Sequence, residues 1–147
     1  MGAEPWYYFV AYQSNIQRAL DALREREFRA GRYNPVVPLL EFPISGDYPG
    51  PGARHASIEA AIEASDADGT RSILDMTRVG TAPDYGVVVP LASETMLELY
   101  GTDKPTKDMV VRNMDFFNEI ERGQGVYLIV YSGDKPSEIL FAGYSYD

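Results

Sequence analysis

The chain begins and ends with runs of apolar and aromatic residues that have the composition of β-strands. The first run covers 6–12, and the last two cover 126–131 and 138–144. β-Branched and aromatic residues favour strands, and a turn-forming segment between two such runs favours a hairpin. The segment 132–136 contains glycine, aspartate and proline, so the last two runs are expected to form an antiparallel hairpin.

Between these runs the apolar positions recur every three to four residues, which is typical of helices with one buried face. The first such stripe consists of Ile16, Leu20, Leu23 and Phe28. Ser14 and Gln17 have the spacing of a capping box at its start. Gly31 suits the left-handed backbone with which a helix commonly ends.

Three further helices are predicted from cap residues and apolar spacing. Ser57 is expected to cap a short helix, and Ser93 a second one that ends at Gly101. Thr106 is expected to cap a longer helix that ends at Gly123. The apolar stripe of that longer helix consists of Val110, Met114, Phe117 and Ile120.

Two more strands are predicted in the middle of the chain, at 72–79 and 85–89. The turn-like segment 80–84 separates them, so they are expected to pair as an antiparallel hairpin with a longer loop. The order is then β-α-α-β-β-α-α-β-β. This order predicts a single α+β domain over 1–147, with a mostly antiparallel sheet of about five strands packed by helices.

A long connection rich in proline and glycine links the first helix to the middle of the chain, from Gly31 to Arg71. Half of the ten prolines lie in its first part: Pro35, Pro38, Pro43, Pro49 and Pro51. Proline fixes φ, so the connection is expected to be stiff. The apolar residues of 36–42 predict that this part packs onto the domain. Long connections inside small domains are usually functional or disordered.

The net charge and the composition limit the classes of partner that the sequence predicts. The net charge is −9, and clustered Lys and Arg for a phosphate backbone or an anionic membrane are lacking, so neither nucleic acid nor membrane is expected as a partner. A basic protein surface or a small ligand remains possible. There is no cysteine, and the first residues lack the features of a secretory signal. A soluble, cytoplasmic protein is expected.

Motifs for catalysis, metals and cofactors are weak. His55 is the single histidine, and a structural hydrogen bond is the favoured interpretation for it. No G-x-S-x-G, G-x-G-x-x-G or P-loop pattern occurs. Asp66 and Asp68 begin like a calcium loop, but Arg71 stands where that loop needs glycine. No catalytic residue, metal or cofactor is therefore predicted.

The unusual local chemistry lies in cations at the two ends of the proline-rich part of this connection and at the end of the short helix that follows it. If the connection folds back, these groups could converge on one anionic ligand. The candidate ligand-binding residues are Arg32, Tyr33, Arg54, His55 and Arg71. The alternative interpretation, which we favour, is that the arginines form ion pairs that pin the connection. The expected partners are Asp66, Asp68 and Asp75.

Four segments together resemble an uncharacterised group of bacterial proteins of about this length. The segments are Trp6–Phe9, Gly31–Pro35, His55–Glu59 and Asp68–Asp75. The group has no assigned activity, so the resemblance implies a bacterial origin and transfers no catalytic residue.

Two functions are compatible with the sequence. The favoured one is a non-enzymatic protein-interaction module, immunity- or antitoxin-like, that covers a basic partner surface. The other is a small-ligand binder or unusual enzyme with a pocket under the Gly31–Arg54 loop that uses Tyr33, His55 and Arg71.

Overall fold

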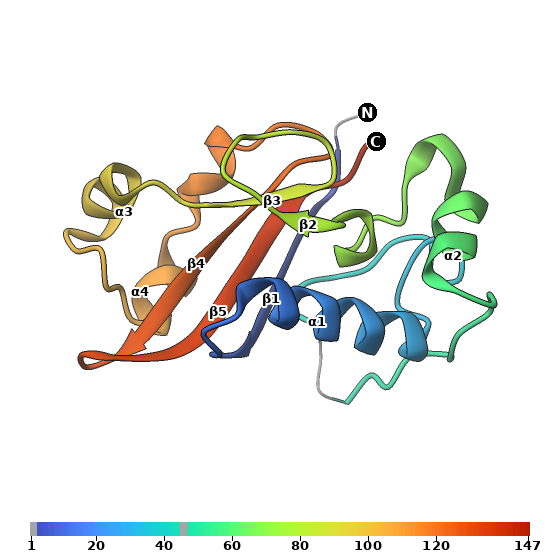
Figure 1. The fold of residues 1–147 in the computed structure, drawn as a ribbon, viewed down its shortest axis with the longest axis horizontal. Helices are drawn as coiled ribbons and strands as arrows, with labels where there is room; N and C mark the ends of the chain where they lie inside the picture. Colours follow the sequence, from blue (N-terminus) through green and yellow to red (C-terminus); the bar gives the residue numbers. More distant parts are fainter. Residues whose placement is uncertain (1–2, 45–46) are drawn as a thin grey trace.

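The computed structural model describes residues 3–44 and 47–147, and a five-stranded sheet lies at the centre of this part of the chain. The strand order across the sheet is β1-β5-β4-β3-β2. In Figure 1 the sheet runs diagonally, with β1 at one edge and the C-terminus close to the beginning of β1. The strands are β1 (Pro5–Ala11), β2 (Arg78–Val79), β3 (Val87–Pro90), β4 (Gly125–Ser132) and β5 (Lys135–Tyr144).

The sheet is mixed. The two long pairings, β1 with β5 and β5 with β4, are antiparallel, and the two short pairings, β4 with β3 and β3 with β2, are parallel. The C-terminal hairpin is confirmed, with its strands extending to Ser132 and from Lys135. The α+β class and the expected order β-α-α-β-β-α-α-β-β are also confirmed.

The predicted hairpin of 72–79 with 85–89 is wrong. Ile73–Asp75 forms a 3-10 turn, and β2 is only two residues long and pairs with β3 in parallel. Ser72 explains the turn, because its hydroxyl accepts a hydrogen bond from the Leu74 amide at 3.2 Å and competes with strand geometry. Ile73, Leu74 and the following Met76 are all fully buried, which also differs from the alternation of a half-buried strand.

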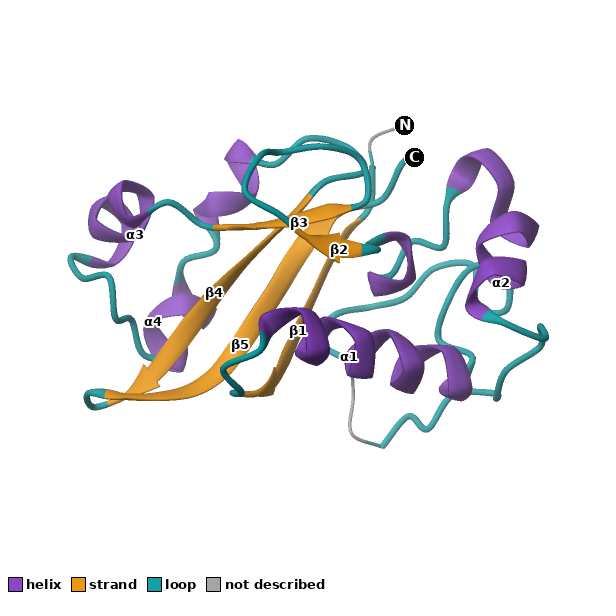
Figure 2. Cartoon of the chain, viewed as in Figure 1, coloured by secondary structure: helices purple, strands orange, loops and turns teal. Residues whose placement is uncertain are grey.

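Helices cover both faces of the sheet (Figure 2). The helices are α1 (Ile16–Ala30), α2 (Ile58–Ser65), α3 (Ser93–Tyr100) and α4 (Lys107–Arg112), with 3-10 turns η1 (Asp66–Asp68), η2 (Ile73–Asp75) and η3 (Asp115–Glu119). One apolar core joins α1 and η2 to residues such as Trp6 and Tyr8. The other core joins α4 and η3 to Leu128 and Val130. Because side chains alternate across a strand, the two cores lie on opposite faces of the sheet.

Two helix starts differ from expectation. Asn15 caps α1 by accepting a hydrogen bond from the Arg18 amide at 3.0 Å, so the capping box from Ser14 is wrong. The Gln17 side chain instead joins α1 to β2, because its oxygen accepts a hydrogen bond from the Val79 amide at 2.7 Å.

Helix α3 begins at Ser93 itself, and Ala92 is its cap residue without a side-chain bond. The caps at Ser57 and Thr106 are confirmed, and so are the left-handed ends at Gly31 and Gly101.

The predicted long helix after Thr106 is interrupted. Helix α4 ends at Arg112, and the Asn113 side chain then accepts a hydrogen bond from the Asp115 amide at 3.0 Å. This local side-chain bond offers the backbone an alternative to the helical pattern. The chain resumes as η3, which buries Phe116 against the sheet. Within residues 3–44 and 47–147, no helix has the length and apolar character needed to cross a membrane.

Candidate functional site

The proline-rich part of the long connection, residues 31–54, is tied to the end of α1 at both of its ends. The last carbonyl groups of a helix lack partners within the helix, and here the connection supplies them. The Gly52 amide donates to the Ala30 carbonyl at 2.8 Å, and the Ala53 amide donates to the Arg29 carbonyl at 3.1 Å. Gly31 has the left-handed φ of 72° that lets the chain turn back at this point. The beginning and the end of the proline-rich segment therefore lie against each other.

Arg32 anchors this junction through a buried ion pair. Its Nε and Nη2 atoms donate to the two carboxylate oxygens of Glu27 at 2.8 and 2.6 Å. Glu27 is fully buried and also accepts a bond from Arg26 at 2.8 Å. The hydrogen bonds to Glu27 raise the pKa of Arg32. Arg32 further donates to the Tyr48 carbonyl at 3.1 Å, so its guanidinium is engaged by the protein itself.

Tyr33 and His55 form the second contact across the connection. Tyr33 is fully buried, and its hydroxyl oxygen lies 2.7 Å from Nδ1 of His55. The Arg54 amide donates to the same hydroxyl at 3.3 Å. Either group can be the donor in the Tyr33–His55 bond, depending on which ring nitrogen of His55 carries the proton. The expected structural hydrogen bond of His55 is thus present.

Arg71 lies on the other side of the connection and binds different groups. Its Nη1 donates to the Pro38 carbonyl at 2.9 Å, and its Nη2 lies 3.5 Å from Asp147 and 4.0 Å from Asp68. Asn34 reinforces this link, because its amide donates to the Thr70 carbonyl at 2.8 Å. Of the aspartates expected to pair with the arginines, Asp68 does so, and the structure adds Asp147.

The five candidate residues are therefore divided among three places. Tyr33, His55 and the main chain of Arg54 come together. The guanidinium groups of Arg32 and Arg71 bind their own partners on either side. Within the described residues, no recorded side-chain bond joins either guanidinium to the Tyr33–His55 pair.

A hollow of about 330 Å³ lies on the connection. It is lined mainly by apolar residues, and Tyr33, His55 and Arg71 are not among them. The lining residues are Val37, Leu39, Leu40, Glu41, Pro43, Ile44 and Tyr48.

Asp75 is a buried carboxylate that the sequence did not single out as a functional group. One of its oxygens accepts a bond from the Thr70 amide at 2.8 Å, and the other has no partner among the described residues. Burial raises the pKa of Asp75, while the bonds from Thr70 and the nearby charge of Arg24 oppose that shift. In the sequence, Asp75 could have been noticed because it is an acidic residue within an apolar run.

The layer formed by α3, α4 and η3 has an outer surface that mixes exposed apolar and acidic side chains. Leu97, Met109 and Val111 are 52%, 41% and 55% exposed. We call this surface the acidic helical face; it also contains the exposed acidic residues Glu94, Glu98, Asp108, Asp115, Glu119 and Glu121 and the exposed basic residues Lys107 and Arg112, and Arg112 pairs with Asp108 at 3.2 Å.

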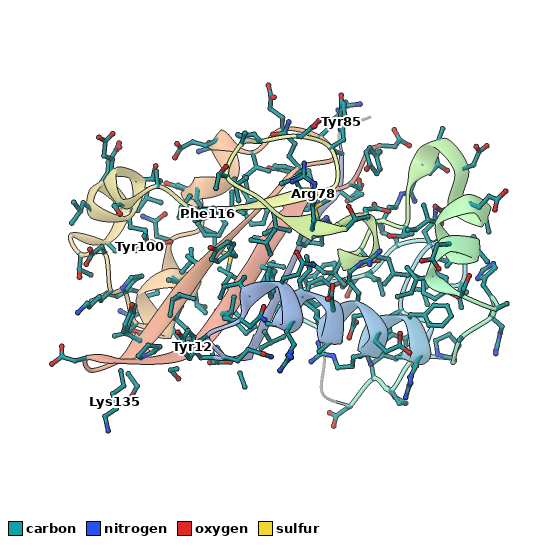
Figure 3. The ribbon with its side chains drawn as sticks, viewed as in Figure 1. Tyr12, Arg78, Tyr85, Tyr100, Phe116 and Lys135 are labelled. Atoms are coloured by element: carbon teal, nitrogen blue, oxygen red, sulfur yellow. The ribbon has the colours of Figure 1, made fainter. Side chains whose placement is uncertain are left out.

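Two contacts hold the parts of this face together. Thr95 of α3 donates to the Glu119 carboxylate at 3.2 Å, and the Tyr100 hydroxyl donates to the Asn113 carbonyl at 2.6 Å. Figure 3 shows Tyr100 beside α3, at the end of the molecule away from α2. Burial, with the charge of Asp115, raises the pKa of Tyr100 to about 12.

The sequence contained a partial signal for this face. Met109 and Val111 flank the buried Val110 and fall outside the apolar stripe predicted for the helix after Thr106. Apolar residues outside the buried stripe of a helix are candidates for contact with a partner.

Groups of three or more His, Cys, Asp or Glu side chains that could hold a metal ion are not found in the described part of the chain. Comparison with protein-family models, with curated proteins and with solved structures gave no match.

Proposed function

We propose that this protein is a non-enzymatic interaction module, immunity- or antitoxin-like, whose acidic helical face covers a basic surface of a protein partner. The observation that carries the proposal is the exposure of Leu97, Met109 and Val111 among acidic residues. Apolar anchors surrounded by a charged rim are the usual composition of protein interfaces.

The charge of the chain supports the same partner chemistry. At −9, the protein attracts a basic partner over a distance, and complementary charge increases the rate of association more than the final affinity. The association should therefore weaken as salt screens the charges. The apolar anchors should contribute the part of the binding that survives at higher salt.

The proposal is tested by capture from a bacterial extract on the immobilised protein over a series of salt concentrations. Wild type is compared with Glu94→Lys/Glu98→Lys, which reverses two charges on the acidic helical face. The matched control is Glu59→Lys/Glu63→Lys, which makes the same change on the exposed side of α2. We expect a protein species that wild type and control retain at low salt, that the face variant loses, and that high salt releases. Equal retention by all three proteins would contradict the proposal.

A second candidate is a small-anion site beside the Tyr33–His55 pair. The His55 ring is half-buried, and the adjacent Arg54 is exposed. Titration with inorganic phosphate, followed by NMR of the His55 ring, tests this function. The ring signals should shift saturably in wild type and in the Arg29→Ala control, and much less in Arg54→Ala; unchanged signals would exclude phosphate as the ligand.

A further inference from the structure

Among residues 3–44 and 47–147, β1 has one edge without a neighbouring strand, because it stands at the end of the strand order. Its hydrogen bonds to β5 fix which residues face that edge. The Tyr12 amide donates to the Ser137 carbonyl at 3.1 Å. At the other end, the Ser145 amide donates to the Glu4 carbonyl at 2.9 Å. Partners alternate along an antiparallel pair, so every second residue of β1 directs its main-chain groups away from β5. These residues are Tyr7, Phe9 and Ala11.

Two hollows follow this free edge. The first, of about 230 Å³, is lined by Tyr7, Tyr8, Phe9, Arg26, Pro43, Ile44, Lys107 and Glu138. The second, of about 210 Å³, is lined by Val10, Ala11, Gln13, Ala19, Ala22, Leu23 and Arg26. Arg26 lines both, so the two hollows form a groove along the strand. Phe42 covers the strand near Tyr7 and Tyr8, where its ring centroid lies 5.9 and 5.1 Å from theirs.

Basic side chains border the groove, and one of them, Arg26, already forms an ion pair with the buried Glu27 at 2.8 Å. Arg18, Ala22 and Arg26 are spaced four residues apart and therefore lie along one side of α1. All three are exposed. On the opposite face of the sheet, Lys107 places its Nζ 4.6 Å above the ring of Phe9 and 3.2 Å from the Glu138 carboxylate.

We propose that the free edge of β1 accepts an extended acidic segment of a partner protein as an added strand. The main chain of the segment pairs with Phe9 and Ala11, as strand addition to a sheet edge requires. Its Asp and Glu side chains on the α1 face lie beside Arg18 and Arg26. Lys107 of α4 lines the first hollow, so the groove borders the acidic helical face, and the protein would use opposite charges on two adjoining surfaces for two different partner segments.

The charge of the groove also decides against a second copy of this chain as the occupant. Two β1 edges related by a two-fold axis would pair antiparallel and keep the two α1 helices on the same face of the joined sheet. The arginine rows of the two copies would then approach each other, and like charges at an interface are unfavourable. An acidic strand has the complementary charge.

The test uses two fluorescently labelled synthetic peptides of equal length, one alternating valine with glutamate and one alternating valine with lysine. Their binding to the whole protein is measured by fluorescence anisotropy. We expect saturable binding of the glutamate peptide and none of the lysine peptide. Ala11→Pro removes only an amide that faces the groove, and proline is tolerated on an edge strand at such a position, so the fold should be kept. This variant should weaken binding by about tenfold or more.

A charge variant tests whether the glutamate peptide binds to the groove itself or non-specifically to the protein surface. Arg18→Gln/Arg26→Gln should weaken the glutamate peptide, whereas Arg78→Gln/Arg112→Gln removes the same charge elsewhere and should not. Figure 3 shows Arg78 far from Tyr12, the residue that follows β1. The proposal is overturned if the glutamate peptide does not bind, if both peptides bind equally, or if Ala11→Pro binds as wild type does. It is also overturned if sedimentation shows a dimer that Ala11→Pro abolishes, because the edge would then be occupied by a second copy.

Discussion

Glu27 and Arg32 are joined by two hydrogen bonds in the buried junction at the end of α1, at 2.8 and 2.6 Å. Arg32 extends the junction to the Tyr48 carbonyl, well into the proline-rich connection. The connection is therefore fixed to the helix by side chains as well as by the main-chain bonds of Gly52 and Ala53. A rigid connection of this kind presents its outer residues in one arrangement.

Removal of one partner from this buried ion pair should lower the free energy of unfolding substantially. Arg32→Ala leaves the Glu27 carboxylate buried with Arg26 alone, and breaking a buried ion pair typically costs about 3–5 kcal/mol of the free energy of unfolding. Urea denaturation measures the change. The control is Arg29→Ala, whose partner Glu25 is exposed, and it should change stability by less than about 1 kcal/mol. Similar effects of the two substitutions would contradict the anchoring role.

Gly31 and Gly101 both end helices with φ of 72°, yet their surroundings differ. A methyl group at Gly31 would overlap the Gly52 carbonyl, whereas at Gly101 it would meet no atom within 4 Å from the described residues beyond its own helix and chain neighbours. Gly101→Ala should therefore lose about 1 kcal/mol for left-handed backbone alone. Gly31→Ala should lose clearly more, because the loop must also move. Thermal unfolding of the two variants gives the comparison, and equal losses would mean that the Gly31–Gly52 contact is easily relaxed.

Asp75 should make the stability depend on pH. Its pKa is raised in the folded state, so the folded protein binds this proton more tightly than the unfolded chain does. The free energy of unfolding should then decrease as pH rises from about 4, the unfolded value, through the folded pKa. The Asp75→Asn variant has no carboxyl group at this position to titrate. The wild type should therefore lose stability relative to the variant as the pH rises through this range. Parallel pH profiles of the two proteins in urea denaturation would be inconsistent with this role.

Tyr100 should make the free energy of unfolding depend on pH in the alkaline range. Its pKa of about 12 exceeds the ordinary value of 10.0, so the folded state again holds the proton more tightly, and stability should fall as pH rises between these values. Tyr100→Phe should lack this fall. At neutral pH the variant should be about 1 kcal/mol less stable, because the bond to the Asn113 carbonyl is lost. Chemical denaturation at neutral and alkaline pH measures both effects, and a variant as stable as wild type at neutral pH would argue against the hydrogen bond.

The predicted elements that the structure confirms are those specified by nearby residues. The cap of Ser57, the glycine end of α1 and the C-terminal hairpin all depend on contacts within a few positions. The parallel pairing of β2 with β3 depends on distant contacts, since Gln17 of α1 binds the Val79 amide. Such a contact between positions far apart cannot be derived from local periodicity.

The candidate site was predicted only in part, because some of its contacts also join residues that the local sequence pattern does not relate. The sequence indicated that cations gather at the ends of the proline-rich part of the connection, residues 31–54, and both of these ends meet at the end of α1. The sequence could not indicate that Glu27, in the middle of a helix, is the buried partner of Arg32, because an acidic helical residue is usually exposed. Nor could it assign Asp147 to Arg71, which lies 76 positions away in the printed sequence.

The pairing of β1 with β5 has a consequence for how the protein is made. β1 pairs with β5, which follows it much later in the chain, so β1 lacks this neighbouring strand until residues 135–144 have left the ribosome. Contacts between such distant segments also slow folding, because a long loop must close before they form. The aromatic residues of β1 are unprotected during that interval, and a chaperone that shields nascent apolar strands would have its greatest effect on this segment.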